Sequence, residues 1–190
     1  AKKIETTRMI FRRKVLENDY SVNAAVEILE MVNDGDLPFD RTMRISTAEE
    51  DAKNKIATRI PTNLKTIHKL LELNRADWAQ MEETRLAKDR VAEIKLRIKG
   101  RRRKMATLVE ELSLRTSKIQ PLLKKLRAIS TKMNHLRDTI HRYQDDPTTC
   151  DPEDIMVMRD ELSGLRSLVL EEPEELVTRV AEITTVFNEY

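Results

Sequence analysis

The sequence predicts an all-α fold, an elongated antiparallel helical bundle with a long helical hairpin. Charged residues make up 36% of the 190-residue chain, while glycine occurs three times and proline six times, so few positions favour turns. Leu, Ile, Val and Met recur at steps of three and four, the spacing that places side chains on one face of a helix. No stretch alternates apolar and polar residues over the length of a strand. A chain of this length can bury one modest core or two small ones, and we expect a single unit because no linker divides it.

The bulk charge and the cysteine count exclude several classes of site. Lys and Arg number 35 and Asp and Glu 33, so no global field draws the chain to a polyanion and any nucleic-acid contact must be local. Cys150 is the single cysteine, which excludes an intrachain disulfide and fits a reducing compartment. No apolar run approaches the roughly 20 residues of a membrane span, and no signal-peptide core follows the basic start. We therefore expect a cytoplasmic protein with no membrane partner.

Residues 1–33 are predicted to be helical. Their apolar residues follow helical spacing, and Ser21 is a candidate cap for a restart of the helix. The sequence Asp34-Gly35-Asp36 then ends the segment. Because the chain lacks an initiator Met and both ends lie in helical patterns without caps, we expect a fragment of a longer protein. The apolar positions are Ile4, Phe11, Val15, Val22, Val26 and Leu29.

Residues 34–84 are predicted to form short helices. Thr47 and Glu50 have the spacing of a capping box, so a helix is expected over residues 48–59 before Pro61 stops it. A further helix starts near Thr62, and its apolar stripe, interrupted by Asn74, favours packing against a partner helix. That stripe contains Leu64, Ile67, Leu71, Trp78 and Met81.

Residues 85–170 are predicted to form the long hairpin. Residues 85–144 contain one glycine and one proline, so we expect a long helical stretch that bends at Gly100 or at Pro121. Its second half carries an uninterrupted stripe at steps of three and four: Ile119, Leu122, Leu126, Ile129, Met133, Leu136, Ile140 and Tyr143. A stripe this narrow is typical of a helix that packs against partner helices.

A return helix is predicted after a turn over residues 145–152. Asp151 and Pro152 form a cap and first-turn pair, and the same steps then recur at Ile155, Met158, Leu162, Leu165 and Val169. Burying the two stripes against each other makes the hairpin antiparallel. The last predicted helix covers residues 173–190, with a fresh stripe at Leu176, Val180, Ile183, Phe187 and Tyr190.

One concentrated run of positive charge is the candidate nucleic-acid site. Residues 99–104 contain five cations in six positions, where neutralising phosphates would release counterions. They are Lys99, Arg101, Arg102, Arg103 and Lys104. The alternative is a solvated helix face, or a set of ion-pair partners for Glu110 and Glu111.

A second basic cluster combines Arg12, Arg13 and Lys14 with Arg8, beside Phe11. An aromatic next to cations suits nucleic acid, but an amphipathic helix with Phe11 inside is the stronger interpretation.

The residues that catalysis or metal binding needs are missing from the sequence pattern. There is no Gly-rich phosphate loop, nucleophile elbow or HExxH motif, and three glycines are too few for most loop-based sites. His135 and His141 are six positions apart and His68 lies alone, so we expect no metal site and no cofactor. Trp78 occupies a stripe position and is predicted to be a core anchor rather than a base-stacking platform. We expect a protein that is not an enzyme.

Both ends of the chain carry a family resemblance. Residues 1–5, Ala-Lys-Lys-Ile-Glu, resemble the close of the first conserved region of primary, housekeeping sigma factors of bacterial RNA polymerase, the sigma-70 family. Residues 8–32 are similar in pattern to the helices that begin the variable segment of that family. Residues 187–190, Phe-Asn-Glu-Tyr, resemble the lead-in to the second conserved region.

Internal motifs resemble one version of that variable segment. Residues 37–42, and residues 102–104 with 108–113, resemble the version found in planctomycete-like bacteria. The resemblance implies the helical, non-conserved insert between the first and second conserved regions. The family's residues that bind the polymerase clamp, read the promoter's minus-ten element and melt DNA lie beyond such an insert, so none is carried over.

Two functions follow as expectations. The resemblance implies a scaffold that contributes to transcription initiation by contacting the core subunits of bacterial RNA polymerase. Promoter DNA would be a partner of the full-length protein, and the basic run would be its contact in this segment. The helical stripes alone allow a free-standing coiled-coil adaptor or scaffold equally well. Light scattering distinguishes them, because an insert that closes its stripes within the chain is a monomer and an adaptor that exposes them dimerises.

Overall fold

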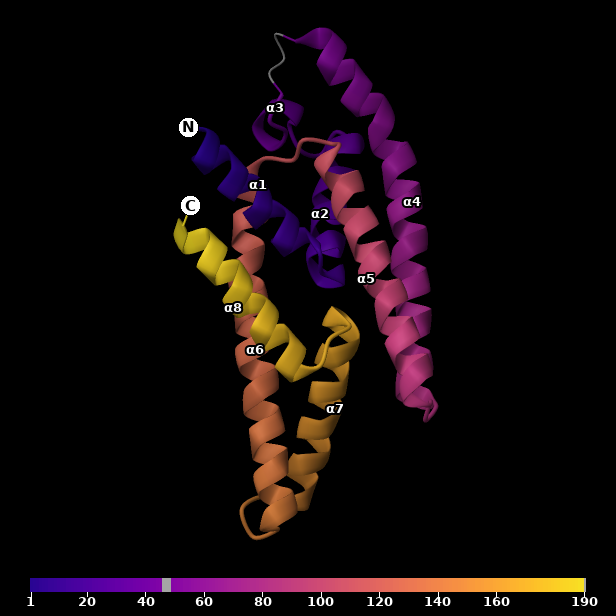
Figure 1. Ribbon diagram of the computed structural model, residues 1–190, viewed down its shortest axis with the longest axis vertical. Helices are drawn as coiled ribbons and strands as arrows, with labels where there is room; N and C mark the ends of the chain where they lie inside the picture. Colours follow the sequence, from indigo (N-terminus) through magenta and orange to yellow (C-terminus); the bar gives the residue numbers. More distant parts are fainter. Residues whose placement is uncertain (46–48, 190) are drawn as a thin grey trace.

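The apolar stripes lie on helices that cover one another. The computed structural model describes residues 1–45 and 49–189, and this part of the chain is all-α, as predicted, with no strand (Figure 1). Its helices are α1 (Lys2–Leu16), α2 (Asp19–Asn33), α3 (Phe39–Thr42), α4 (Glu50–Glu83), α5 (Lys88–Glu110), α6 (Thr116–Asp145), α7 (Pro152–Val169) and α8 (Pro173–Glu189).

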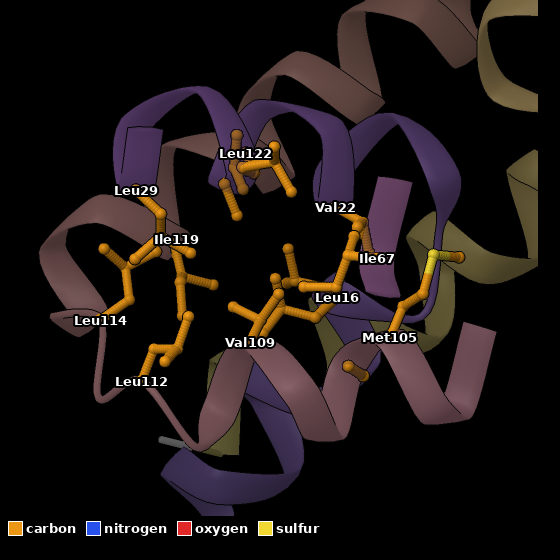
Figure 2. Close-up of a cluster of buried hydrophobic side chains, with 14 of the residues drawn as sticks. Leu16, Val22, Leu29, Ile67, Met105, Val109, Leu112, Leu114, Ile119 and Leu122 are labelled. Carbon is orange, nitrogen blue, oxygen red and sulfur yellow. The ribbon is translucent and has the colours of Figure 1, made fainter. Parts of the chain in front are cut away.

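Two antiparallel hairpins give the molecule its elongated shape. Figure 1 shows α4 beside α5 along one side and α6 beside α7 at the far end, while α1 and α8 cross the upper part of α6. The main core lies where α1, α2, α4, α5, α6 and α8 meet, and Figure 2 shows its buried side chains. The central members contributed by α1, α2 and α5 are Leu16, Val22, Leu29, Met105 and Val109.

The predicted hairpin of α6 and α7 is confirmed. Every member of the α6 stripe is buried except Ile129 and Tyr143, which are partly covered, and the stripe faces α7 and α8. On α7 only Ile155 and Val169 are fully buried, because fewer helices cover the middle of this helix. The predicted start is also confirmed, since the Asp151 carboxylate accepts a hydrogen bond of 2.8 Å from the backbone N–H of Glu153.

The expected stop at Pro61 is wrong, because α4 is one continuous helix of 34 residues with this proline inside it. Residues 34–84 therefore hold one long helix and the four-residue α3, not a set of short helices. Pro61 lies on the exposed face, where water can bond the backbone carbonyl that loses its partner, while Ile60 and Leu64 are buried on either side. Packing of that stripe thus overrides a local helix breaker.

The long stretch expected over residues 85–144 is interrupted, although at neither Gly100 nor Pro121. Helix α5 ends at Glu110, and α6 starts at Thr116. Residues 85–170 therefore contain the second helix of the α4–α5 hairpin and both helices of the α6–α7 hairpin. Ser113 takes the left-handed conformation with φ of 60°, and Leu112 and Leu114 on either side of it are fully buried. Two backbone hydrogen bonds, Arg44 N–H to Ser113 O at 2.8 Å and Arg115 N–H to Thr42 O at 2.9 Å, hold this turn.

The N-terminal prediction needs two corrections. The helix restarts at Asp19, capped by Asn18, whose side-chain oxygen accepts a hydrogen bond of 3.2 Å from the backbone N–H of Ser21, so Ser21 is the donor and not the cap. Ile4 is 53% exposed and does not join the core. The proposed capping box rests on Thr47, which lies outside the described residues.

Truncating the α6 stripe should destabilise the fold. Leu126 is fully buried, so Leu126→Ala leaves a cavity and should lower the free energy of unfolding by about 2–5 kcal/mol. The matched control is Leu96→Ala on α5, where the side chain is 69% exposed and the change should stay within about 0.5 kcal/mol of zero. Urea unfolding followed by circular dichroism measures both, and equal losses would contradict the packing described here.

Candidate functional site

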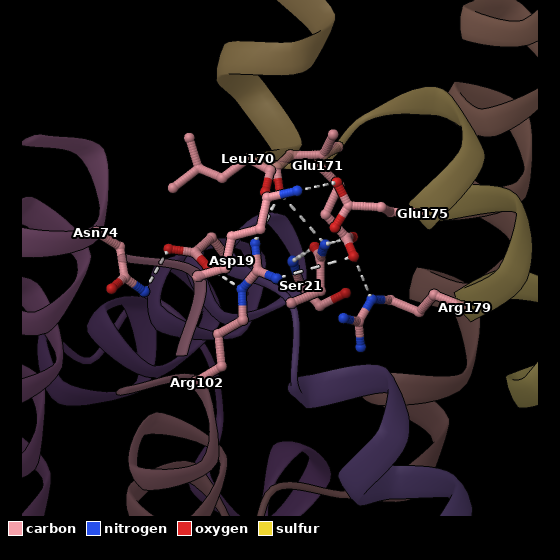
Figure 3. Close-up of polar contacts among 11 residues, drawn as sticks. Asp19, Ser21, Asn74, Arg102, Leu170, Glu171, Glu175 and Arg179 are labelled. Atoms are coloured by element: carbon pink, nitrogen blue, oxygen red, sulfur yellow. Dashed lines mark hydrogen bonds and ion pairs between the residues drawn. The ribbon is translucent and has the colours of Figure 1, made fainter. Parts of the chain in front are cut away.

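The basic run contains a buried arginine, Arg102. Arg102 interrupts the apolar stripe of α5, four residues after Ile98 and three before Met105, so it points inward with them. Its Nε donates to Asp19 Oδ1 at 2.6 Å, and its Nη2 donates to the Leu170 carbonyl at 2.9 Å (Figure 3). The guanidinium therefore joins α5 to the start of α2 and to the end of α7.

A hydrogen-bonded network completes this junction. Asn74 of α4 donates to the second oxygen of Asp19 at 3.1 Å, and Asn18 donates to Glu171 Oε2 at 2.7 Å. Arg179 of α8 donates to Glu171 Oε1 at 2.7 Å, and the Arg102 Nη1 lies 3.8 Å from the same oxygen. Each carboxylate is almost fully buried, which is tolerable because each has a cationic partner and further donors.

The second basic cluster also contributes one arginine to the interior. Arg12 is fully buried, and its Nε and Nη2 both bond the carboxylate of Glu110, with the Nη2 to Oε1 distance at 2.7 Å. The Nη1 donates to Thr116 Oγ1 at 2.8 Å, so this side chain joins α1 to both ends of the turn between α5 and α6. Phe11 is buried as predicted.

The structure separates the five predicted phosphate contacts. Arg101 turns toward α4, where it bonds Asp77 at 2.6 Å, and Arg102 is buried against Asp19. Both already have carboxylate partners, so they leave the candidate set, and Lys99, Arg103 and Lys104 remain on the exposed surface. The ion-pair partners suggested in the alternative interpretation are wrong as well. Glu110 pairs with Arg12, and Glu111 accepts from Asn63 and lies 3.7 Å from Arg59.

Two of the remaining cations line a groove between α1, α5 and α8. This charged groove has a volume of about 660 Å³. On the α5 side Lys95, Lys99 and Arg103 follow one another at steps of four, which places them on one face. On the opposite side, α8 contributes several carboxylates. The charged residues lining the groove are Lys14, Glu17, Lys95, Lys99, Arg102, Arg103, Glu171, Glu174, Glu175, Arg179 and Glu182.

The carboxylates of α8 differ in their partners. Glu174 accepts a hydrogen bond of 2.8 Å from Arg137 of α6, and this bond lowers the pKa of Glu174 below its ordinary value. Glu175 lies 3.5 Å from Lys95 across the groove, with both side chains nearly half exposed. Glu182 follows seven residues later on the same face of α8. The groove is thus lined by a basic row on α5 and, on α8, by three acids and by Arg179, which is paired with Glu171.

Other residues considered from the sequence have structural surroundings. Trp78 is 5% exposed, which confirms its place in the core. The His68 Nε2 lies 2.6 Å from Glu30 Oε1 and so links α4 to α2. Within residues 1–45 and 49–189, no group of three or more His, Cys, Asp or Glu side chains is arranged to hold a metal ion. No helix in that part of the chain has the length and apolarity to cross a membrane.

The local sequence marks only the α5 side of the groove. Lys95 belongs to the basic row and could have been found from its four-residue spacing to Lys99 and Arg103. Glu175 and Glu182 could not, because nothing in the local sequence places α8 opposite α5. Comparisons with protein-family models, with curated proteins and with solved structures find no match to this chain.

Removing the buried guanidinium should destabilise the protein strongly. Arg102→Met leaves Asp19 buried without its cation, and the expected loss is about 3–5 kcal/mol of unfolding free energy. Lys104→Met, an exposed neighbour with the same charge change, should alter stability by less than about 0.5 kcal/mol.

A second variant keeps this test specific. Adding Asp19→Asn to Arg102→Met removes the uncompensated carboxylate and should recover part of the loss. Urea unfolding at neutral pH measures all three proteins. If Arg102→Met lowered the free energy of unfolding no more than Lys104→Met does, the buried junction would not stabilise the fold.

Proposed function

We propose that the chain is the helical, non-conserved insert of a bacterial primary sigma factor and contributes to transcription initiation by contacting RNA polymerase. The proposal includes a cytoplasmic location and no catalytic role. Its sequence support is the resemblance of residues 1–5 and 187–190 to the adjoining ends of the family's first and second conserved regions.

One structural observation carries the proposal furthest, which is the packing of α1 against α8. The start of α1 and the end of α8 lie close together at one edge of the molecule (Figure 1). The rings of Phe11 and Phe187 join the two helices, with centroids 5.4 Å apart. Adjacent ends suit an insert, because the host segments that precede and follow it can then meet without distortion.

The covered stripes favour the insert over a free-standing adaptor. An adaptor needs an exposed stripe for its partner helix, whereas the most regular stripe, on α6, packs on α7 and α8 of the same chain. The two buried arginines add contacts among helices far apart in sequence, as in a module with its own interior.

Binding to polymerase tests the proposal directly. The 190-residue chain should bind bacterial core RNA polymerase in the absence of DNA, and full-length sigma factor should displace it. Interferometry with immobilised core enzyme measures both. The control competitor is the same sigma factor with its insert deleted, which should displace the chain poorly. Absence of binding at tens of micromolar, or equal displacement by both competitors, would contradict the proposal.

A contact with promoter DNA is the finer part of the proposal and is tested through salt dependence. Replacing Lys99, Arg103 and Lys104 by Gln in the full-length sigma factor removes three exposed cations. If all three meet phosphates, the slope of log affinity against log salt for holoenzyme and promoter should fall by about 2–3.

The matched control for the salt experiment uses exposed lysines elsewhere on the surface. Lys65, Lys69 and Lys125 changed to Gln give the same loss of charge away from the groove, and the slope should stay near that of the unmodified holoenzyme. Equal slopes for both triple variants would remove the DNA contact and leave the polymerase contact as the function.

A further inference from the structure

The basic row of α5 is the part of the surface best arranged to meet a polyanion. Lys95, Lys99 and Arg103 stand on one face at steps of four, so about 6 Å separates successive positions along the helix axis. Lys14 of α1 lines the same groove and adds a fourth cation. A ridge of this kind attracts phosphates in proportion to the cations that are free to replace counterions.

Helix α8 places acids opposite that row. Glu175 and Glu182 lie on one face of α8 and line the groove from its other side, and Glu175 is 3.5 Å from Lys95. Glu174 also lines the groove, but its hydrogen bond to Arg137 ties it to α6. This leaves Glu175, which lies 3.5 Å from Lys95, and Glu182 as the other α8 carboxylates that line the groove.

One physical effect follows from this arrangement. A carboxylate within a Debye length, about 8 Å at physiological salt, repels an entering phosphate and so lowers the positive potential that the phosphate meets at the row. The row therefore binds phosphate less tightly than its number of cations suggests.

We propose that α8 is an electrostatic shield, whose carboxylates Glu175 and Glu182 hold down the affinity of the α5 basic row for duplex DNA. The position of α8 is fixed by the buried junction, where Arg179 bonds Glu171 and Arg102 bonds the carbonyl that ends α7 (Figure 3). The fold thus holds the shield in place. The inference rests on the proposed function and adds that the chain weakens its own contact with DNA.

Removing the shield should tighten DNA binding. The double variant Glu175→Gln and Glu182→Gln removes two charges and keeps the size of both side chains. At low salt its affinity for a duplex of mixed sequence should rise about three- to tenfold, since interactions between exposed charges are each worth a factor of a few. The slope of log affinity against log salt should also become steeper. Fluorescence anisotropy of a labelled duplex, titrated with the 190-residue chain, measures both.

Two controls separate shielding from a change of net charge. Glu72→Gln with Glu83→Gln makes the same chemical change at exposed positions of α4 outside the groove. A further pair of proteins carries Gln at Lys95, Lys99 and Arg103, with and without the α8 substitutions. The α4 variant should bind DNA with the affinity of the unmodified chain. In the pair that lacks the basic row, the α8 substitutions should leave the affinity unchanged.

These measurements test the shield separately from the proposed function on which it rests. A gain that equals that of the α4 variant, or one that persists without the basic row, overturns the shield. Either result leaves the binding of core polymerase untouched, because that experiment contains no DNA. Conversely, failure of the chain to bind polymerase would overturn the proposed function, even if the α8 double variant binds DNA more tightly as expected.

Discussion

The buried ion pair between Asp19 and Arg102 is the constraint on which the arrangement of helices depends. One guanidinium meets the first turn of α2, the carbonyl that ends α7 and, at longer range, Glu171 at the elbow before α8. A buried pair contributes little net stability over an apolar substitute, because both charges lose their hydration. Its directional bonds do specify geometry, since any slip of α5 leaves the buried Asp19 without its cation.

The connection between α7 and α8, residues 170–172, links the buried ion pair to the surface groove. Leu170 has φ of 52°, a left-handed conformation that is unfavourable for a residue with a branched side chain. Its carbonyl accepts from Arg102 and its side chain is buried, so packing and hydrogen bonding offset the strain. The chain then turns at Glu171 and starts α8 at Pro173, which brings the acids of α8 to the basic row of α5.

The basic run illustrates why the candidate site was only partly predictable. Its composition indicates a polyanion contact, but on a helix successive residues point in different directions. Arg101 faces α4, Arg102 the interior, and Lys99 and Arg103 the groove. The apolar stripe of Ile94, Ile98, Met105 and Val109 could have marked Arg102 as inward-facing, because an arginine in such a register is buried with its neighbours.

The sequence by itself determined the helical class, the stripes of α6, the turn after Asp145 and the cap at Asp151, because helical periodicity and capping depend on residues within a few positions. Tertiary structure decided what those local rules leave open. Helix α4 continues through Pro61 because its neighbours hold the buried stripe on either side. The break at Ser113 occurs without glycine or proline because Leu112 and Leu114 are buried and the backbone pairs with residues 42–44. The charged groove exists only because distant helices meet, and no local pattern encodes that meeting.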